Sequence, residues 1–124
     1  MLADVDVFKA CSDITRLRLL FLLRERELCV CELVAVLGMP QGKISRHLAT
    51  LRQAGLVDTR REGAWIYYRL VAANGTAAKH VLAYLSESHG AAQVEQDRCR
   101  LKTLAAQGEI CVPNPAPVLP AEIT

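Results

Sequence analysis

The sequence contains little that would place the protein in a membrane or outside the cell. Its longest dense apolar stretch, residues 17–23, is interrupted by Arg18 and is far too short to cross a bilayer. The first ten residues, MLADVDVFKA, carry acids where a secretory signal would carry a basic segment. These two absences predict a cytoplasmic protein that has no membrane partner.

The sequence also lacks the residue patterns of common enzyme sites. It has no Ser/His/Asp set, no glycine-rich phosphate loop and no paired carboxylates placed for acid–base chemistry. A thiol oxidoreductase would need a C-x-x-C motif after a strand in a βαβ unit, and neither is present. We therefore expect a protein that is not an enzyme.

Proline and glycine are scarce, and the composition is that of a helix-rich globular protein. The chain has 124 residues, of which 52% are hydrophobic and 23% charged, so it is long enough for one domain with its own core. In a cytoplasmic protein, cysteines are expected to be reduced thiols available for metal or redox chemistry rather than disulfides. This chain has five: Cys11, Cys29, Cys31, Cys99 and Cys111.

Positive charge is concentrated in the middle of the chain, although the formal net charge is only +2. Residues 41–69 hold two acids, Asp58 and Glu62, against six basic residues: Lys43, Arg46, Arg52, Arg60, Arg61 and Arg69. Such a patch fits nucleic acid as a partner, although charge alone fits an ordinary solvated surface equally well.

Apolar spacing and chain-breaking residues predict mainly helices with one small β-hairpin. Gly38 is suited to end the third helix, and the turn at Glu62 and Gly63 separates two β-rich runs, 56–61 and 64–70. The predicted helices lie at residues 5–11, from Ser12 or Asp13 to about 23, and at 31–37, 41–54, 76–89 and 91–106. We expect a DNA-binding domain with dimerisation helices at 1–90, a C-terminal helical extension at 91–111 and a flexible Pro-rich tail at 112–124.

The order helix, glycine-bearing turn, helix and hairpin is typical of a winged helix-turn-helix, whose second helix enters the major groove. In residues 41–54 the spacing predicts one buried stripe: Ile44, Leu48 and Leu51. The side chains left outside it or at its edges, and those at the hairpin tip, are candidate DNA contacts: Gln41, Lys43, Arg46 and His47 on the helix, and Arg60 and Arg61 on the wing. The alternative is that the charged ones are simply solvated and His47 lies at a packing edge.

Three segments together resemble the ArsR/SmtB family of dimeric winged-helix metalloregulatory repressors, and most closely its arsenic-responsive branch. They are FKACSDITRLRLLFLL, ELCVCEL and QGKISRHLATLRQAGLVDTRREGAWIYYRL, within roughly residues 5–70. The resemblance implies a homodimer held by the first and last helices, binding of double-stranded operator DNA in the apo state, and release on metal(loid) binding. It also implies recognition-helix positions for Gln41, Lys43, Ser45, Arg46 and His47. We take as candidates for the dimer contact Val81, Leu82 and Leu85.

The segment ELCVCEL places Cys29 and Cys31 one residue apart near the predicted start of a helix. Within a regular helix their side chains would point about 200° apart, so they could share an ion only if Cys29 lies at or before the helix start. A helix N-terminus favours the thiolate, and soft thiolates select thiophilic ions. We predict that Cys29 and Cys31 bind the inducer, and that closing them on one ion strains or unwinds the first turn of the helix.

The resemblance makes trivalent arsenic or antimony the expected inducer. Arsenic-responsive relatives often carry a third cysteine at the position of Val34, so a third thiolate here would have to come from elsewhere or be absent; the candidates are Cys11, Cys99 and Cys111. Two functional alternatives stay open, namely a thiol-based redox-sensing repressor and a zinc- or cadmium-sensing one. A third reading makes Cys31 a core residue and Cys29 an incidental surface thiol.

Overall fold

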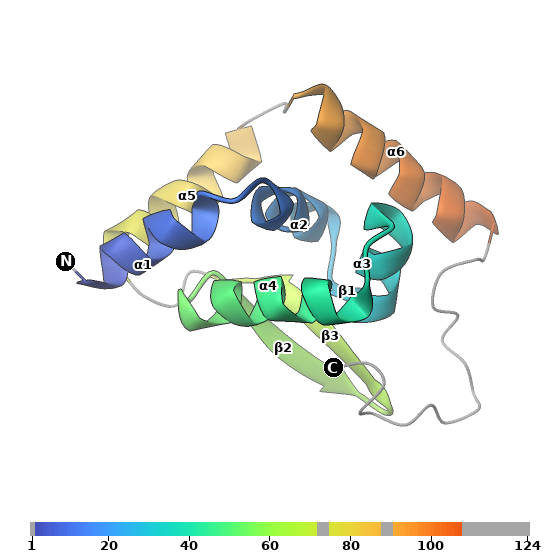
Figure 1. Ribbon diagram of the computed structural model, residues 1–124, viewed down its shortest axis with the longest axis horizontal. Helices are drawn as coiled ribbons and strands as arrows, with labels where there is room; N and C mark the ends of the chain where they lie inside the picture. Colours follow the sequence, from blue (N-terminus) through green and yellow to red (C-terminus); the bar gives the residue numbers. More distant parts are fainter. Residues whose placement is uncertain (1, 72–74, 88–90, 108–124) are drawn as a thin grey trace.

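The computed structural model describes residues 2–71, 75–87 and 91–107. In chain order the elements are α1 (Leu2–Cys11), α2 (Ile14–Glu25), β1 (Leu28–Cys29), α3 (Val30–Leu37), α4 (Gln41–Gln53), β2 (Val57–Glu62), β3 (Trp65–Leu70), α5 (Gly75–Glu87) and α6 (Ala92–Gln107). The arrangement confirms the predicted winged helix-turn-helix, with α3 and α4 as the two helices and β2 and β3 as the wing (Figure 1). The predicted tail at 112–124 lies outside the described residues, and within the described ranges no helix is long and apolar enough to cross a membrane.

Helix α2 lies in the middle of the fold, between the pair α1 and α5 on one side and α3 on the other (Figure 1). Asp13 caps its start, because the carboxylate accepts a hydrogen bond from the backbone N–H of Arg16 at 3.1 Å. Leu19, Leu20 and Leu22 are fully buried. Burial on nearly all sides explains why α2 has a dense apolar run rather than a clean amphipathic stripe.

The turn between α3 and α4 is set by Gly38 and Pro40. Gly38 adopts the left-handed conformation at φ 66°, and its N–H donates to the carbonyl of Val34 at 2.8 Å, which ends α3. The Pro40 carbonyl then accepts from the N–H groups of Lys43 and Ile44, which opens α4. The predicted stripe of Ile44, Leu48 and Leu51 is confirmed, because all three side chains are completely buried.

The sheet has three antiparallel strands in the order β1–β3–β2, one strand more than the predicted hairpin. Gly63, at φ 61°, occupies the wing turn, where the left-handed conformation favours glycine. The additional strand β1 is only two residues long, and it pairs Leu28 with Tyr68 and Cys29 with Tyr67. The wing is therefore joined directly to the segment that contains Cys29.

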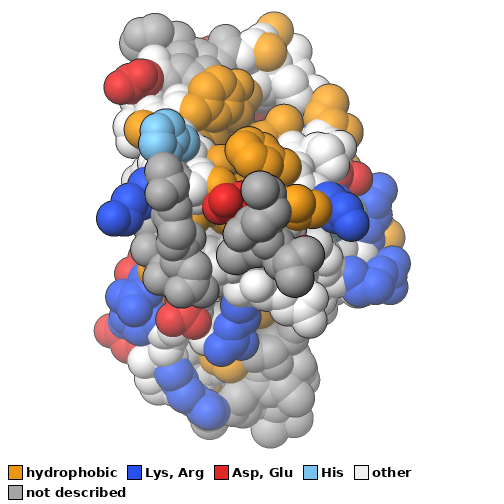
Figure 2. Space-filling model, turned by 90° about the vertical axis from the view of Figure 1, so that its left-hand side faces the viewer, with side chains coloured by type: hydrophobic (Ala, Val, Ile, Leu, Met, Phe, Trp, Pro, Cys, Tyr) orange, Lys and Arg blue, Asp and Glu red, His pale blue; other side chains and the backbone are white. Residues whose placement is uncertain are grey.

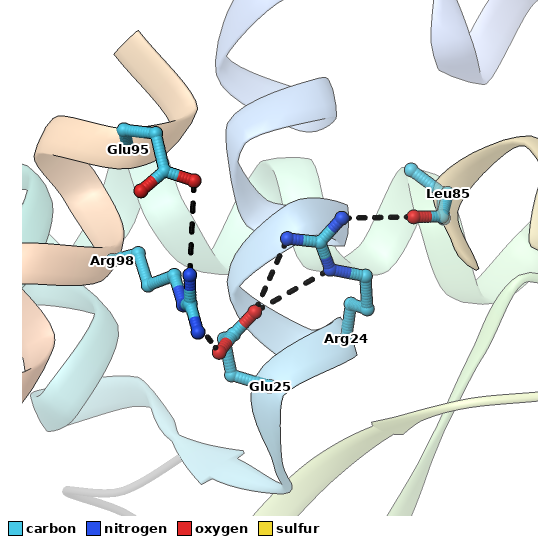
Figure 3. A network of polar contacts seen from close by, with 5 residues as sticks. All are labelled: Arg24, Glu25, Leu85, Glu95 and Arg98. Carbon is cyan, nitrogen blue, oxygen red and sulfur yellow. Dashed lines mark hydrogen bonds and ion pairs between the residues drawn. The ribbon is translucent and has the colours of Figure 1, made fainter. Parts of the chain in front are cut away.

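Helix α6, which lies in the predicted C-terminal helical extension, packs on α2 and α3 and shares their hydrophobic core through Val94, Leu101 and Leu104. Figure 3 shows the polar contacts that tie α2 to the two C-terminal helices. Arg98 on α6 pairs with Glu25 at 3.1 Å, and Arg24 donates to the carbonyl of Leu85 on α5 at 2.9 Å. The described part of residues 91–111 is thus an integral layer of the fold.

Candidate DNA interface and thiol site

Helix α4 displays polar and basic side chains away from its buried stripe. Gln41, Lys43 and Arg46 are exposed, and Ser45 is half-buried. The first turn of α4 has no acidic residue. An exposed helix N-terminus with basic neighbours suits the phosphates and base edges of a duplex.

His47 is placed differently from the other candidate residues of α4. It is half-buried, and its Nδ1 lies 3.2 Å from Nη1 of Arg16 on α2. Burial is the largest cause that lowers the pKa of His47, and Arg16, Lys43 and Arg46 lower it further while Asp13 opposes them. His47 is therefore neutral at physiological pH and is bound to the body of the protein through one nitrogen.

The two wing arginines differ in how freely they can meet DNA. Arg60 is occupied by carboxylates, with Nε 2.6 Å from Glu27 and Nη1 2.7 Å from Glu62, and its guanidinium lies 5.1 Å from the centre of the Tyr67 ring. Arg61 is exposed and donates to the Gly63 carbonyl at 3.4 Å. A phosphate would have to compete with two carboxylates for Arg60. Among the described residues, no carboxylate is recorded in an ion pair with Arg61.

The structure brings Cys29 and Cys31 together. Cys29 is the last residue of β1 and the N-cap of α3, with an extended backbone at φ −87° and ψ 166°. This conformation turns its sulfur toward Cys31, and the two Sγ atoms lie 2.9 Å apart. The separation is longer than a covalent S–S bond of about 2.05 Å, so no covalent bond joins these two sulfurs.

Glu32, which the sequence reasoning did not single out, holds the start of α3. Its carboxylate accepts the backbone N–H of Cys29 at 3.0 Å and pairs with Arg26 at 3.0 Å, although the side chain is only 8% exposed. A capping residue followed by Glu three positions later is the spacing of a capping box, and that signal was present in the segment CVCE. The reason for missing it is that Cys is not among the usual capping residues.

The expectation that the helix N-terminus would favour a thiolate is wrong for Cys29. The pKa of its thiol is raised to about 12, chiefly by burial and also by the nearby Glu32 carboxylate, while hydrogen bonds from the backbone of Glu32 and Cys31 only partly oppose them. Cys29 is 1% exposed, so the desolvation of a charged sulfur outweighs the helix dipole. At physiological pH this sulfur is a neutral thiol.

The start of α3 is regular although the sulfurs are in contact, and the expectation that closing them on one ion strains or unwinds its first turn stays a prediction. The capping box is intact while the sulfurs are in contact. For comparison, two thiolates on one tetrahedral zinc lie roughly 3.8 Å apart, given Zn–S bonds of about 2.3 Å. A pair 2.9 Å apart must therefore widen, rather than close, to share an ion.

The described residues supply two adjacent sulfurs and place no third ligand beside them. Cys11 lies on α1, where burial raises the pKa of its thiol, and Cys99 is exposed on α6. Cys111 lies outside the described residues. Within the described part of the chain, no group of three or more His, Cys, Asp or Glu side chains is placed to hold a metal ion.

The end of the molecule formed by α1 and α5 carries exposed apolar side chains (Figure 2). Phe8 on α1 is 63% exposed and Tyr84 on α5 is 55% exposed, and both line an apolar groove between these helices. Of the residues expected at a dimer contact, Val81 and Leu82 are half-buried, but Leu85 is only 1% exposed. Leu85 belongs to the monomer core, because its side chain faces inward on α5.

Comparison with known proteins relates the chain to bacterial regulators. The model of the family described as bacterial regulatory protein, arsR family, matches residues 13–59. The arsenic resistance transcriptional regulator ArsR1 of Pseudomonas putida is 58% identical over 65 residues, which cover 52% of this chain and 51% of that protein. The arsenical resistance operon repressor of Escherichia coli is 50% identical over 70 residues, which cover 56% and 60%. The chain thus spans about half to three-fifths of the length of these relatives.

A cadmium resistance regulator homolog of Staphylococcus aureus, CadC, is 40% identical over 65 residues, which cover 52% of this chain and 54% of that protein. Among solved structures, the homodimeric winged helix-turn-helix DNA-binding domain of Mb0332 from Mycobacterium bovis matches with a TM-score of 0.55 and 32% identity, over 72% of this chain and 87% of that domain. The fold, the helix-turn-helix match and these identities agree. The chain belongs to the arsR family of bacterial regulatory proteins.

Proposed function

We propose that the protein is a homodimeric transcriptional repressor that binds operator DNA in the cytoplasm and leaves it when trivalent arsenic or antimony binds Cys29 and Cys31. The observation that carries the proposal is the contact of the two sulfurs, 2.9 Å apart, where β1 meets α3. The arsenic resistance proteins among the relatives support the choice of inducer.

In this proposal α4 enters the major groove and the wing lies along the backbone. Lys43 and Arg46 are exposed on α4 and suit phosphates and guanine, while Gln41, Ser45 and His47 supply neutral hydrogen-bonding groups. The wing contributes Arg61 and, in competition with its acidic partners, Arg60. A dimer formed through α1 and α5 would present two copies of α4 to half-sites roughly 34–36 Å apart.

The protonation state of Cys29 favours arsenous acid as the inducer over a divalent cation. With both cysteines reduced, each thiol proton would leave with one hydroxyl of As(OH)₃ as water, so two S–As bonds would form and two waters would be released with no net release of protons. A divalent cation must instead displace the protons into solution, which is costly for a thiol whose pKa is about 12.

The test first selects a DNA duplex that the protein enriches from a random pool. Fluorescence anisotropy of this labelled duplex then measures its release from the protein on addition of arsenite, antimonite, cadmium or zinc. Cys29→Ser and Cys31→Ser should each bind the duplex normally and fail to leave it with arsenite. Cys99→Ser, an exposed cysteine on α6, is the matched control and should respond like the wild type. Normal arsenite release by the Cys29, Cys31 double variant would refute the proposal.

Two other inducers compete with arsenite at the same residues. Sulfurs already in contact would form a disulfide if an oxidant such as peroxide removed two electrons and both protons, which makes a redox sensor the second candidate. The similarity to a cadmium regulator homolog keeps a zinc or cadmium sensor as the third. Titration of free thiols after peroxide or arsenite treatment, in parallel with DNA release, separates these candidates from the first.

A further inference from the structure

Arg16 connects three helices at the start of α2. It lies three residues after the capping Asp13, and its side chain turns back to the end of α1. There Nε donates to the carbonyl of Ala10 at 2.7 Å and Nη2 to that of Lys9 at 3.3 Å. The last carbonyls of a helix have no intrahelical partner, and a cation at this end also complements the helix dipole. Arg16 thus completes the C-terminus of α1.

The same guanidinium reaches α4, because Nη1 lies 3.2 Å from Nδ1 of His47. A guanidinium has five donors and no acceptor, so the His47 Nδ1 in this contact must accept. The neutral ring then carries its proton on Nε2. The tautomer of His47 follows from the identity of its partner, since the other donor–acceptor assignment would place two N–H groups against each other.

We propose that Arg16 is a positioning residue for DNA binding: it ties α4 to the end of α1 and fixes His47 in the Nε2–H tautomer, so that His47 can meet DNA only as a hydrogen-bond donor. The acceptors that fit such a donor are phosphate oxygens and the N7 and O6 atoms of guanine. The inference rests on the proposed role of α4 in reading DNA. It adds Arg16, which does not itself touch DNA, and it specifies that His47 donates the hydrogen bond in its contact with DNA.

The surroundings of His47 favour the neutral ring that this tautomer requires. The charge of Asp13, the N-cap of α2, favours protonation of the ring, whereas Arg16 of α2 and Lys43 and Arg46 of α4 oppose it, and burial opposes it most. If the ring were protonated, an N–H at Nδ1 would face the Arg16 guanidinium, and the hydrogen bond would be replaced by repulsion between two cations. Acidification should therefore weaken DNA binding through this contact, whereas a solvated histidine would strengthen it by adding positive charge.

The first test measures the ring nitrogens of the full-length protein by heteronuclear NMR. The wild type should show His47 with Nδ1 unprotonated and Nε2 protonated, and Arg16→Gln should mix the tautomers and raise the pKa of His47. His80, exposed on α5, is an internal control that should not change. A wild-type ring protonated at Nδ1, or a tautomer that Arg16→Gln leaves unchanged, would overturn the proposal.

The second test measures affinity for the enriched duplex. Arg16→Gln should weaken binding about fivefold, equivalent to one hydrogen bond of about 1 kcal/mol, and should remove the further weakening that the wild type shows as the pH falls. Arg16→Lys keeps the charge but cannot reach α1 and His47 together, so it should rescue only part of the affinity. If the wild type binds no duplex, the proposed function fails while the NMR result stands. If it binds but both variants match it at every pH, the positioning role is refuted.

Discussion

Removal of the Glu32 carboxylate should loosen the start of α3 and make the protein more sensitive to its inducer. The Glu32 side chain accepts the backbone N–H of Cys29 at 3.0 Å and pairs with Arg26 at 3.0 Å. In Glu32→Ala the buried N–H of Cys29 loses its acceptor, which costs about 1–3 kcal/mol. The half-exposed Arg26 adds at most about 1 kcal/mol.

Glu32→Gln separates the hydrogen bond from the charge. Its amide oxygen can still accept the Cys29 N–H, so the free energy of unfolding should fall by less than about 1 kcal/mol. Removal of the negative charge should also bring the pKa of Cys29 below its value of about 12, because the Glu32 carboxylate is one of the causes that raise it. The two variants therefore distinguish the structural from the electrostatic role of the same side chain.

The assays are urea unfolding followed by circular dichroism, and the arsenite concentration that releases half of the DNA. If intact capping opposes release, a loss of about 1.4 kcal/mol should lower that concentration up to about tenfold in Glu32→Ala. Glu95→Ala is the control, since Glu95 is an exposed acid that pairs with Arg98 at 3.8 Å. The reasoning fails if Glu32→Ala unfolds within about 0.5 kcal/mol of this control and releases DNA at the wild-type arsenite concentration.

Three further predictions concern other parts of the molecule. Asp97→Ala should destabilise the fold by about 3–5 kcal/mol in urea, because Asp97 is 4% exposed and pairs twice with Arg18 at 2.9 Å; a loss below about 1 kcal/mol would contradict this. Phe8→Asp combined with Tyr84→Asp should sediment as a folded monomer, and a persistent dimer would place the interface elsewhere. Between about pH 6 and 8 cadmium affinity should rise at least about tenfold per pH unit, since the neutral Cys29 must lose a proton, whereas arsenite affinity should stay level; equal slopes would contradict the proton balance.

The winged helix-turn-helix could be predicted because its elements carry local signals. The stripe of Ile44, Leu48 and Leu51 has helical spacing, and Gly38 and Gly63 occupy positions where a left-handed backbone is needed. Strand β1 could not be predicted in the same way. Two residues have no periodicity, and they become a strand only because β3 lies beside them in the folded protein.

The chemistry of the site was harder to predict than its residues. The sequence placed Cys29 at a helix start, where the dipole favours a thiolate, but burial depends on neighbours far along the chain and reverses the direction of the pKa. The helical spacing of Leu85 was compatible with an exposed apolar face as well as with a core position. The structure also buries Asp97 against Arg18, a pairing that no local pattern in the sequence indicates. In each case long-range packing, which local patterns do not record, determined the outcome.

The two sulfurs belong to different elements, and this bears on how DNA would be released. Cys29 ends β1, whereas Cys31 lies in the first turn of α3, so widening their separation of 2.9 Å either rotates a side chain about its Cα–Cβ bond or moves one element against the other. Helix α3 is anchored by buried Leu33, Val36 and Leu37 and is covered by α6. Strand β1 is held by two residue pairs with β3.

The strand is therefore the element that yields more easily, and it is joined to the wing in two ways. Cys29 pairs with Tyr67 of β3, and Glu27, two residues before Cys29, holds Arg60 of β2 at 2.6 Å. We expect a change at the two sulfurs to reach the wing before α4, because β1 pairs directly with β3, whereas α4 contacts α3 and the wing strand β2. Loss of backbone contacts by the wing would then weaken the electrostatic part of DNA binding first, and that part supplies much of the affinity of any such complex.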